Sequence, residues 1–395
     1  MRIAIIGGGI GGSTAALALR QLGFEPQVFE QAPDLLEVGA AILMWPNAMR
    51  VLRRLGLSDT IREHGSVLEK SRWLRRDGKL LNHFSFPKSE VPAVAVHRAE
   101  LQKALVHALP QDSIQLNHVF QNYEQLPDRI VARFSDGSQF ECDVLIGADG
   151  VHSRARDQLL NDGAAVDRGY VAWRGIVPYV SEAVALATAT EIYGRGQRFG
   201  IGPLGAGKVG WWASANKNLL RDGGRTSPGV ADHDLIREEL LGLFHDWCEP
   251  VPDLIRATAP AGLIRNSVFD REPGKKWGEG CLTLIGDAIH PLTPNLGQGG
   301  CLAIEDAAVL ARCFEKYSPN GDANEAARAL RRYESLRHSR TAWVTRFSRT
   351  YGIIGQLENG LASRTRDVLL SLVPKQLTTR FLRGIFDYDA YAVDV

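Results

Sequence analysis

The sequence has few cysteines, almost no net charge and no long apolar run, and each shortage excludes a class of protein. Its five cysteines lie far apart and form no CxxC pair, which argues against a disulfide framework and a zinc site, so no bound metal is expected. The 46 basic and 45 acidic side chains nearly cancel, whereas a nucleic-acid binder usually gathers a basic excess. No run of about 18 apolar residues is present, so no membrane-spanning helix is expected. The simplest compartment is a reducing cytoplasm.

What the chain does contain is typical of a folded protein of one or two domains. Apolar residues make up 45% of its 395 residues and charged residues 23%, which excludes wholesale disorder. Glycine is abundant, with 40 residues, and three glycine clusters carry the functional signal. The apolar start, residues 1–6, runs into the first cluster without a small-residue cleavage site, so we interpret it as a buried strand rather than a signal peptide.

The first cluster contains the pattern GxGxxG at Gly7, Gly9 and Gly12. A strand precedes it, a helix over 13–22 follows, and a second strand ends at Glu30, which completes a β-α-β unit. Glycine lets the backbone approach a pyrophosphate, and the helix N-terminus presents free N–H groups to the phosphates. A carboxylate at Glu30 accepts hydrogen bonds from a ribose hydroxyl and disfavours a 2′-phosphorylated nucleotide. The pattern predicts nucleotide binding rather than a simple glycine-rich turn.

Two further glycine clusters also follow short apolar strands. The segment 147–150 (GADG) would by itself be explained as well by a structural turn. The segment 286–291 (GDAIHP) places Asp287 at a strand end, where it can hold a hydroxyl, and 294–300 (PNLGQGG) then opens a helix. This second helix N-terminus is aimed at something anionic or electron-rich. A helix cap would explain either piece alone, but not both in this order.

The order of the elements predicts an α/β fold in which the chain leaves one domain, builds another and returns. Strands of the dinucleotide-binding type are expected within 2–30, 144–150 and 281–290, and the block 170–216 between the last two reads as all-β. Hairpins are expected around Asp77-Gly78 and Asp136-Gly137. Helices are expected at 300–314, 324–348 and 361–382, and a mobile loop is expected at 221–233.

The three motifs, in this order and spacing, resemble the class A FAD-dependent monooxygenases, the aromatic hydroxylase and epoxidase group, over about residues 1–350. The stretches 39–57 (GAAILMWPNAMRVLRRLGL) and 194–204 (GRGQRFGIGPL) are most similar to salicylate-hydroxylase-like enzymes, urate hydroxylases and zeaxanthin epoxidases. The resemblance implies a Rossmann-like FAD-binding domain, an inserted β-sheet substrate domain and C-terminal helices. The expected boundaries are 1–70, 98–168 and 276–350 for the first, 71–97 and 169–275 for the second, and 351–395 for a helical tail.

The resemblance also implies which residues hold FAD. Gly7, Gly9, Gly12 and Glu30 would bind its ADP half, and Arg98, at the start of a helix, would contact its phosphate or ribityl region. Asp149 would interact with both FAD and the pyridine nucleotide, and Asp287 would hold the ribityl chain. The segment from Pro294 to Gly300, which includes Gly299, would lie beside the isoalloxazine ring, with backbone N–H groups of Leu296 and Gly297 at its N1–C2 edge.

The implied activity is that of an FAD-dependent NAD(P)H:oxygen monooxygenase. In this family reduced flavin adds O₂ at C4a, and an electron-rich ring or alkene attacks the distal oxygen of the hydroperoxide, which gives hydroxylation or epoxidation. Water has to be excluded from such a site, and a β-rich domain over the flavin would provide the dry pocket. The electron donor is NADPH or NADH, and no second GxGxxG follows a strand to give it a separate fold.

The candidate catalytic residues are Arg198, Tyr193 and Pro294. Strand alternation predicts that Arg198 lies on one face of its strand and that Tyr193 and Arg195 lie on the other. An arginine facing the flavin could hold a phenolate or carboxylate, whereas the alternative for any one of them is a surface ion pair. Phe199, Trp211 and Trp212 are expected on the same strands, with sheet packing as the alternative role for the tryptophans. His290 is interpreted as structural support for its loop.

Three alternatives remain open in the sequence. The tail carries Arg364, Arg366, Lys375, Arg380 and Arg383 among leucines and phenylalanines, so it could lie on a membrane surface, although packing on the FAD domain is favoured. A flavin-dependent reductase or dehydrogenase would share the fold. A binding module of the GDP-dissociation-inhibitor type is expected to lose the cofactor glycines and the ribityl aspartate, all of which are present here. The expected partners are a small-molecule substrate and O₂, with no nucleic acid, and the oligomeric state is left open.

Overall fold

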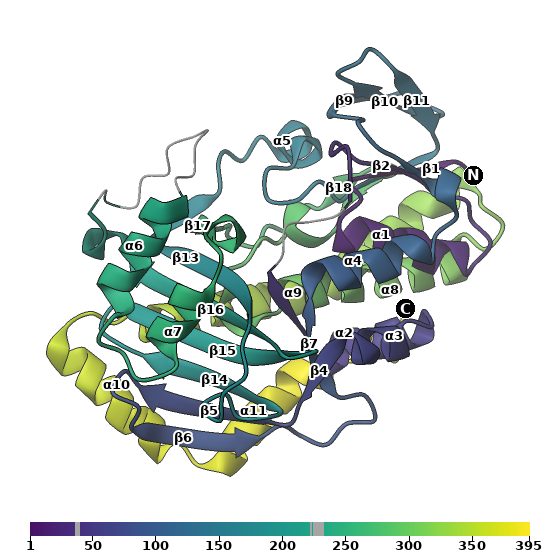
Figure 1. Ribbon diagram of the computed structural model, residues 1–395. Helices are drawn as coiled ribbons and strands as arrows, with labels where there is room; N and C mark the ends of the chain where they lie inside the picture. Colours follow the sequence, from purple (N-terminus) through teal and green to yellow (C-terminus); the bar gives the residue numbers. More distant parts are fainter. Residues whose placement is uncertain (36–39, 222, 224–232) are drawn as a thin grey trace.

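The computed structural model describes residues 1–35, 40–221, 223 and 233–395, and most of the loop expected at 221–233 lies outside them. Two large sheets organise the chain (Figure 1). One has six strands and holds the chain's N-terminal strand, and the other has seven. Two small sheets of three strands each complete the β structure of these residues.

The six-stranded sheet has the order β18-β19-β12-β1-β2-β8, and every pairing except that of β18 is parallel. Its strands are β1 (Ile3–Ile6), β2 (Gln27–Phe29), β8 (Ile114–Gln115), β12 (Val144–Gly147), β18 (Gly278–Glu279) and β19 (Leu282–Leu284). The three glycine clusters follow β1, β12 and β19, which are neighbours. Because neighbouring parallel strands end at the same edge of a sheet, the fold brings three loops far apart in sequence to one place.

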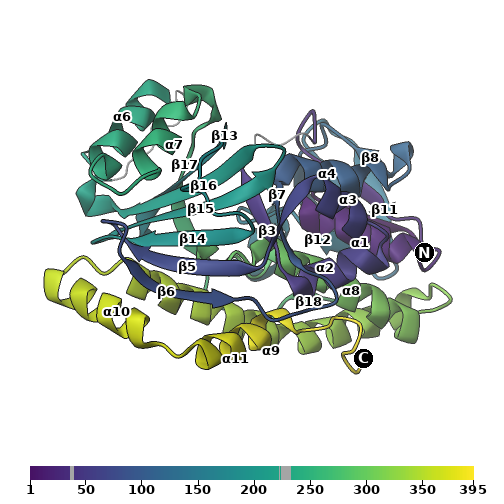
Figure 2. The same cartoon turned by 60° about the horizontal axis from the view of Figure 1, so that its bottom comes forward.

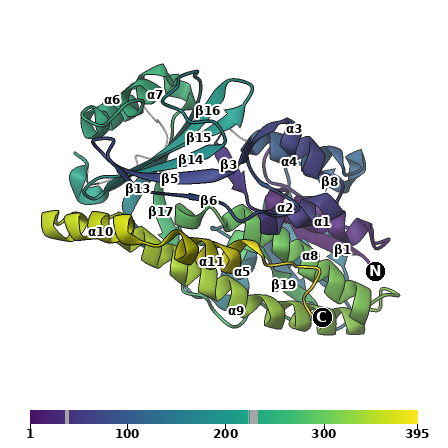
Figure 3. The ribbon, with the colours of Figure 1, turned by 90° about the horizontal axis from the view of Figure 1, so that it is seen from below.

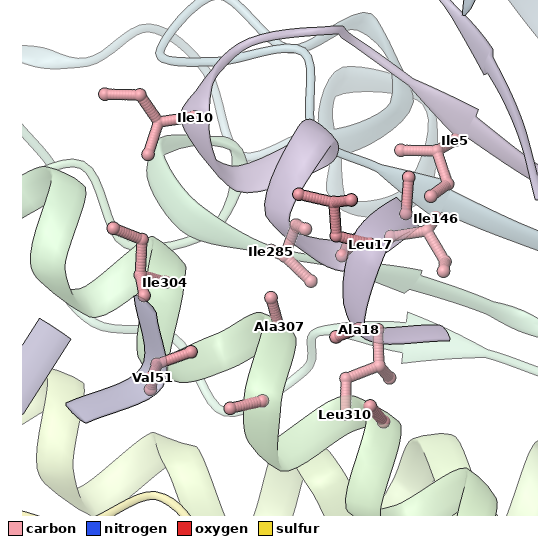
Figure 4. Packing of buried hydrophobic residues seen from close by; sticks show 14 of the residues in the cluster. Ile5, Ile10, Leu17, Ala18, Val51, Ile146, Ile285, Ile304, Ala307 and Leu310 are labelled. Atoms are coloured by element: carbon pink, nitrogen blue, oxygen red, sulfur yellow. The ribbon is translucent and has the colours of Figure 1, made fainter. Parts of the chain in front are cut away.

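Small and branched side chains pack the helices closely against this sheet (Figure 4). Leu17 and Ala18 of α1 (Ile10–Arg20) lie near Ala307 and Leu310 of α8 (Gly299–Tyr317), with Ile285 between the helices and the strands. All five are buried. This packing fixes the N-termini of both helices at the edge where the glycine loops meet.

The seven-stranded sheet has the order β17-β13-β16-β15-β14-β5-β6. Its strands are β5 (Lys70–Arg75), β6 (Leu80–Ser85), β13 (Val166–Pro178), β14 (Thr188–Tyr193), β15 (Gln197–Gly205), β16 (Lys208–Asn216) and β17 (Ile264–Asp270). One face carries a second hydrophobic cluster, with Phe199 and Trp211, against α6 (His233–Phe244) and α7 (Val251–Ala257). Figures 2 and 3 show α9, α10 and α11 on the opposite side of the sheet.

Two glycines make room for the paired tryptophans of β16. Trp211 lies over Gly175 on one face of the sheet and Trp212 lies over Gly200 on the other, and a Cβ atom on either glycine would overlap the indole ring. Trp211 therefore has the packing role that was the alternative in the sequence, whereas Trp212 lies on the face turned away from α6 and α7.

The small sheets have the orders β3-β7-β4 and β11-β10-β9. Their strands are β3 (Ala41–Met44), β4 (Gly65–Leu68) and β7 (Ala93–His97), and β9 (Phe120–Gln125), β10 (Ile130–Phe134) and β11 (Gln139–Cys142). The hairpins expected around Asp77-Gly78 and Asp136-Gly137 are present as β5–β6 and β10–β11. Strand β7 pairs with β3 and β4 and not with the seven-stranded sheet.

Seven further α-helices lie within the described residues. They are α2 (Pro46–Arg54), α3 (Ser58–Glu63), α4 (Arg98–His107), α5 (Arg154–Leu160), α9 (Ala323–Gly355), α10 (Gly360–Leu372) and α11 (Lys375–Phe386). The tail expected to be helical over 361–382 is helical, but as two helices. Helices α10 and α11 are separated at Val373-Pro374, because proline has no N–H to continue a helix. Within the described ranges, no helix is both long and apolar enough to cross a membrane.

Candidate cofactor and substrate site

The loop after β1 has the shape that the GxGxxG pattern predicts. Gly7 has a φ of +105°, and a Cβ atom on Gly12 would overlap the Gly7 carbonyl oxygen, so both positions need glycine. Gly9 differs, because a Cβ built there would meet no atom within 4 Å. The open side of Gly9 lies at the N-terminus of α1, where unpaired N–H groups favour a phosphate.

Glu30 fixes this loop and keeps lone pairs for a ligand. Its Oε2 accepts a hydrogen bond of 2.7 Å from the backbone N–H of Gly8, and its Oε1 accepts one of 2.9 Å from Ala32. A carboxylate offers about four lone-pair positions, so two remain for the hydroxyls of a ribose. The structure thus gives Glu30 a role in shaping the loop that the sequence did not indicate.

Asp149, in the second glycine cluster, lies at the N-terminus of α5. Its Oδ2 accepts hydrogen bonds from the backbone N–H groups of Arg154 (2.8 Å) and Ala155 (3.2 Å). Within the described part of the chain, its buried Oδ1 has no hydrogen-bond partner. Burial raises the pKa of this carboxyl group despite its hydrogen bonds. A buried acceptor without a partner is costly, and it fits a ligand that donates a hydrogen bond here.

Asp287, in the third cluster, lies in the 3₁₀ turn Gly286–Ala288, close to the start of α8. Asp287 keeps exposed surface although protein atoms surround its carboxylate closely enough to desolvate it. Its Oδ1 lies 3.8 Å from the position a Cβ would take on Gly299 at the start of α8. Desolvation by the surrounding protein raises its pKa, while the charges of His290 and Arg98 oppose that rise. Arg98, the first residue of α4, therefore lies within electrostatic reach of Asp287. This is compatible with the contact to the phosphate or ribityl region expected for Arg98, which stays a prediction.

The loop Pro294–Leu296 and the N-terminus of α8 form a row of backbone donors. Gly297 has a φ of +59° and donates its N–H to the Pro294 carbonyl (3.0 Å), while the Leu296 carbonyl accepts from the Trp45 indole (3.2 Å). Pro294 is exposed, and no side chain caps the start of α8 among the described residues. Free N–H groups with the partial positive charge of a helix N-terminus suit the electron-rich edge of a reduced flavin ring.

A buried charge network supports this loop from behind. Asp306 Oδ2 accepts from the Gly286 N–H (2.9 Å) and from His290 Nε2 (2.6 Å), and Asp306 Oδ1 accepts from Arg337 Nε (2.7 Å). Burial alone would raise the pKa of Asp306, but the charges of His290 and Arg337 outweigh it and lower the pKa to about 2. His290 is buried and supports the loop, as the sequence indicated. Arg337 was missed, because nothing near it in the sequence shows its partner.

Arg198 is buried and joins the seven-stranded sheet to the same loop. Its Nη1 donates to Glu191 Oε1 (3.0 Å), its Nη2 donates to Asn295 Oδ1, and its guanidinium lies 5.2 Å from the Trp212 ring centroid. It is 1% exposed, so the ion pair that was the alternative in the sequence exists, but in the interior. Asn295 immediately precedes Leu296, and its amide also donates to the Tyr170 hydroxyl (3.1 Å).

The expectation that Arg198 and Tyr193 lie on opposite faces is wrong. Tyr193 ends β14, Arg198 lies in β15, and the two are direct partners across the antiparallel pair, so their side chains share a face. The alternation fails because residues 194–196 form the turn between the strands, and Arg195 lies exposed in that turn. The Tyr193 hydroxyl is 2.5 Å from that of Tyr351, so it contacts a neighbour within the protein.

The sequence also missed Arg174, which lies in β13 directly across from Trp212 and shares its face of the sheet. It is partly buried and donates to the Asn266 amide oxygen (3.3 Å). Among the described residues no carboxylate forms an ion pair with it, whereas each of three neighbouring arginines has such a partner: Arg168, Arg198 and Arg349. Burial and the nearby charge of Arg98 lower its pKa. Arg174 therefore lies within electrostatic reach of Arg98 at the cofactor loops, beside an indole ring.

These features define an FAD-binding flavoprotein, and comparisons with known proteins show the family. The chain belongs to the family described as "FAD binding domain", whose model matches residues 1–209 and 268–348. Together with the relatives below, this makes the protein an FAD-dependent monooxygenase, as the resemblance in the sequence implied. The expected α/β fold with FAD as cofactor is likewise confirmed.

Several similar proteins are enzymes matched over most of their length. An aurachin C monooxygenase/isomerase of Stigmatella aurantiaca is 37% identical over 378 residues, 94% of each chain. An FAD-dependent urate hydroxylase of Klebsiella pneumoniae is 35% identical over 350 residues, 86% of each chain. The crystal structure of Klebsiella pneumoniae HpxO with FAD and uric acid has a TM-score of 0.85 and 31% identity, covering 98% of this chain and 96% of that one.

Proposed function

We propose that the enzyme hydroxylates a small planar aromatic molecule that carries an anionic or strongly polar oxygen, with NADH or NADPH as electron donor. The observation that supports this choice is the pair of Arg174 and Trp212, side by side on the sheet face that adjoins the cofactor loops. A guanidinium without a carboxylate partner binds an oxyanion, and an indole provides a stacking surface for a flat ring. An isoprenoid alkene, the other substrate class implied by the sequence, would contact the indole but would give the guanidinium of Arg174 no anionic partner.

Relatives support both substrate classes by their names. One structure similar to this chain holds uric acid, and another relative is a zeaxanthin epoxidase of Prunus armeniaca. Urate is a flat molecule rich in polar oxygens, whereas zeaxanthin is an isoprenoid. Arg174 favours the first type here, because burying a cation against an apolar chain is costly.

In the proposed reaction bound FAD supplies the redox chemistry that activates O₂. The backbone N–H groups of Leu296 and of the first turn of α8 would stabilise negative charge on the reduced ring. The N–H of Gly297 is already bonded to the Pro294 carbonyl and is not among these donors. Arg174 holds the substrate oxygen and orients the ring over Trp212. Pro294 remains a predicted catalytic residue beside the isoalloxazine ring, and its exposure at the loop is compatible with that position.

We assign Arg198 and Tyr193 a positioning role in place of direct catalysis. Arg198 fixes Asn295 and so the loop beside the cofactor, and Tyr193 holds Tyr351, whose hydroxyl donates to Glu191 (2.7 Å). Both are buried in contacts with protein atoms. The boundaries of the FAD-binding domain, the substrate domain and the tail also stay a proposal. Strand β7 lies in the segment 71–97 assigned to the substrate domain, but it pairs with β3 and β4. The proposed compartment remains the cytoplasm, which suits five free cysteines.

The direct test combines flavin spectroscopy with oxygen labelling. The purified protein is mixed with phenols, purines, quinolones and polyenes in turn, and changes in its flavin absorption and NAD(P)H oxidation are recorded. We expect a polar aromatic ligand to perturb the bands and to gain one oxygen atom from ¹⁸O₂. Turnover that needs no O₂ would support the dehydrogenase alternative, and a response to polyenes alone would contradict the proposed substrate class.

A further inference from the structure

Helix α10 carries its apolar side chains on the outside of the molecule. Leu361, Val368, Leu369 and Leu372 are 77%, 57%, 60% and 69% exposed. With 3.6 residues per turn, these positions form one stripe along the helix. A helix that packs on a protein normally turns such a stripe inward, so the arrangement of α10 is the reverse of the usual one.

The inward side of α10 is held by polar contacts. The buried Arg366 donates to the carbonyls of Gly355 (3.0 Å) and Gly194 (2.8 Å), and its guanidinium lies 5.1 Å from the Tyr193 ring centroid. Asn82 of β6 donates to the carbonyls of Leu370 (2.9 Å) and Val373 (3.0 Å). Arg366 is therefore not part of a basic outer surface, and the exposed leucines are not what holds the helix in place.

Exposed positive charges accompany the apolar stripe on α10 and continue along α11. Arg364, Arg380 and Arg383 are exposed, and no ion pair with them is found in the described part of the chain. Leu377, 59% exposed, continues the apolar side chains into α11. The one acidic residue between 360 and 386 is Asp367, which is bonded to Arg366 (2.8 Å). We call this set the α10–α11 surface: Leu361, Val368, Leu369, Leu372, Leu377, Arg364, Arg380 and Arg383.

We propose that the α10–α11 surface docks on the face of a phospholipid bilayer that carries anionic headgroups. Leucines flanked by arginines are the composition of helices that lie in a membrane interface, and anionic lipids attract such arginines. A second copy of this chain fits less well, because a two-fold contact would bring identical arginines together. Figures 2 and 3 show α10 and α11 on the side of the seven-stranded sheet that is opposite α6 and α7, with α9 beside α11.

The test is sedimentation of the full FAD-loaded protein with vesicles of phosphatidylcholine, alone or mixed with phosphatidylserine. We expect binding to the mixed vesicles that falls at least about tenfold in Leu369→Gln/Leu372→Gln, because two apolar anchors are removed. Arg364→Gln should weaken binding about fivefold at low salt. The matched control is Leu186→Gln, since Leu186 is 88% exposed but lies before β14, and it should bind like the parent.

Several outcomes would overturn the proposal. These are no sedimentation with mixed vesicles, equal binding to neutral vesicles, or an equal loss in the control variant. A dimer in solution that Leu369→Gln/Leu372→Gln converts to a monomer, without vesicle binding by the parent, would identify a second copy as the occupant. Flavin content and the thermal midpoint of each variant show that it is folded, because the substituted side chains are exposed.

Discussion

At the scale of single residues, the proposed FAD site depends on glycines, which have no side chain, in the loop after β1. Gly9 and Gly12 are both parts of the GxGxxG pattern, yet the structure separates their reasons. Gly12 is needed by the protein itself, because a Cβ there would strike Gly7, whereas Gly9 faces open space. The open space suits the pyrophosphate of FAD, so the two glycines should respond differently to substitution.

We therefore expect Gly9→Ala to fold normally but to retain FAD at least about tenfold more weakly, since its methyl group would occupy the place of the phosphate. Gly12→Ala should instead lower the thermal stability of the apoprotein. Flavin fluorescence titration and thermal unfolding of the flavin-free proteins measure the two effects. An unchanged FAD affinity in Gly9→Ala would contradict the placement of the pyrophosphate.

Asp287 offers a second test at this scale. Replacing it with alanine removes a carboxylate acceptor that lies beside the start of α8, and we expect FAD retention to fall strongly. Asp136→Ala is the control, because Asp136 lies in the β10–β11 turn and its hydrogen bonds to described residues stay within that turn. Flavin content after gel filtration is the measurement, and full occupancy in Asp287→Ala would show that the ribityl chain is held elsewhere.

At the scale of elements, the decisive feature is the side-by-side placement of Arg174 on β13 and Trp212 on β16. The sequence indicated the strands and the tryptophans but not the register between them. The expectation that Tyr193 and Arg198 lie on opposite faces failed for the same reason. Residues 194–196 form a turn between β14 and β15, so the alternation of one strand does not continue into the next. Side-chain direction within one strand can be read locally, but cross-strand neighbours depend on turns and pairing.

The role proposed for Arg174 predicts that Arg174→Gln raises KM for an acidic aromatic substrate by about tenfold or more, with a smaller change in kcat, since a charge-assisted contact to the substrate is lost. Arg256→Gln on α7 is the control, because its partner is the exposed Asp253 (3.0 Å). Steady-state kinetics with the ligand found by the spectral screen gives both constants. Equal effects on a neutral polyene would argue against an oxyanion contact.

At the scale of the whole molecule, one buried network joins the loop after β19 to the two long helices α8 and α9. Asp306 of α8 bonds to the loop after β19 and to Arg337 of α9. Because its pKa is lowered from 3.8 to about 2, its charge stabilises the fold above the unfolded pKa near 3.8. That contribution is lost as the pH falls toward 2.

The lowered pKa predicts a pH-dependent stability. As the pH falls from about 5 to about 2, through the unfolded and then the folded pKa, the parent should lose more free energy of unfolding than Asp306→Asn, by on the order of 2 kcal/mol in total. Denaturant unfolding at several pH values measures the difference. Asp157→Asn on α5 serves as a control for general acid sensitivity, and parallel curves for parent and Asp306→Asn would contradict the lowered pKa.

The sequence by itself determined the cofactor class, the order of the elements and the three glycine loops. It could do so because each depends on residues a few positions apart: a strand, a glycine turn and a helix start. Only the tertiary structure decided what surrounds those loops, namely the Asp306–Arg337 network, the Arg174–Trp212 pair and the outward stripe of α10. Their partners lie on separate elements, and contact between such elements is decided by strand register and helix packing, which no local pattern records.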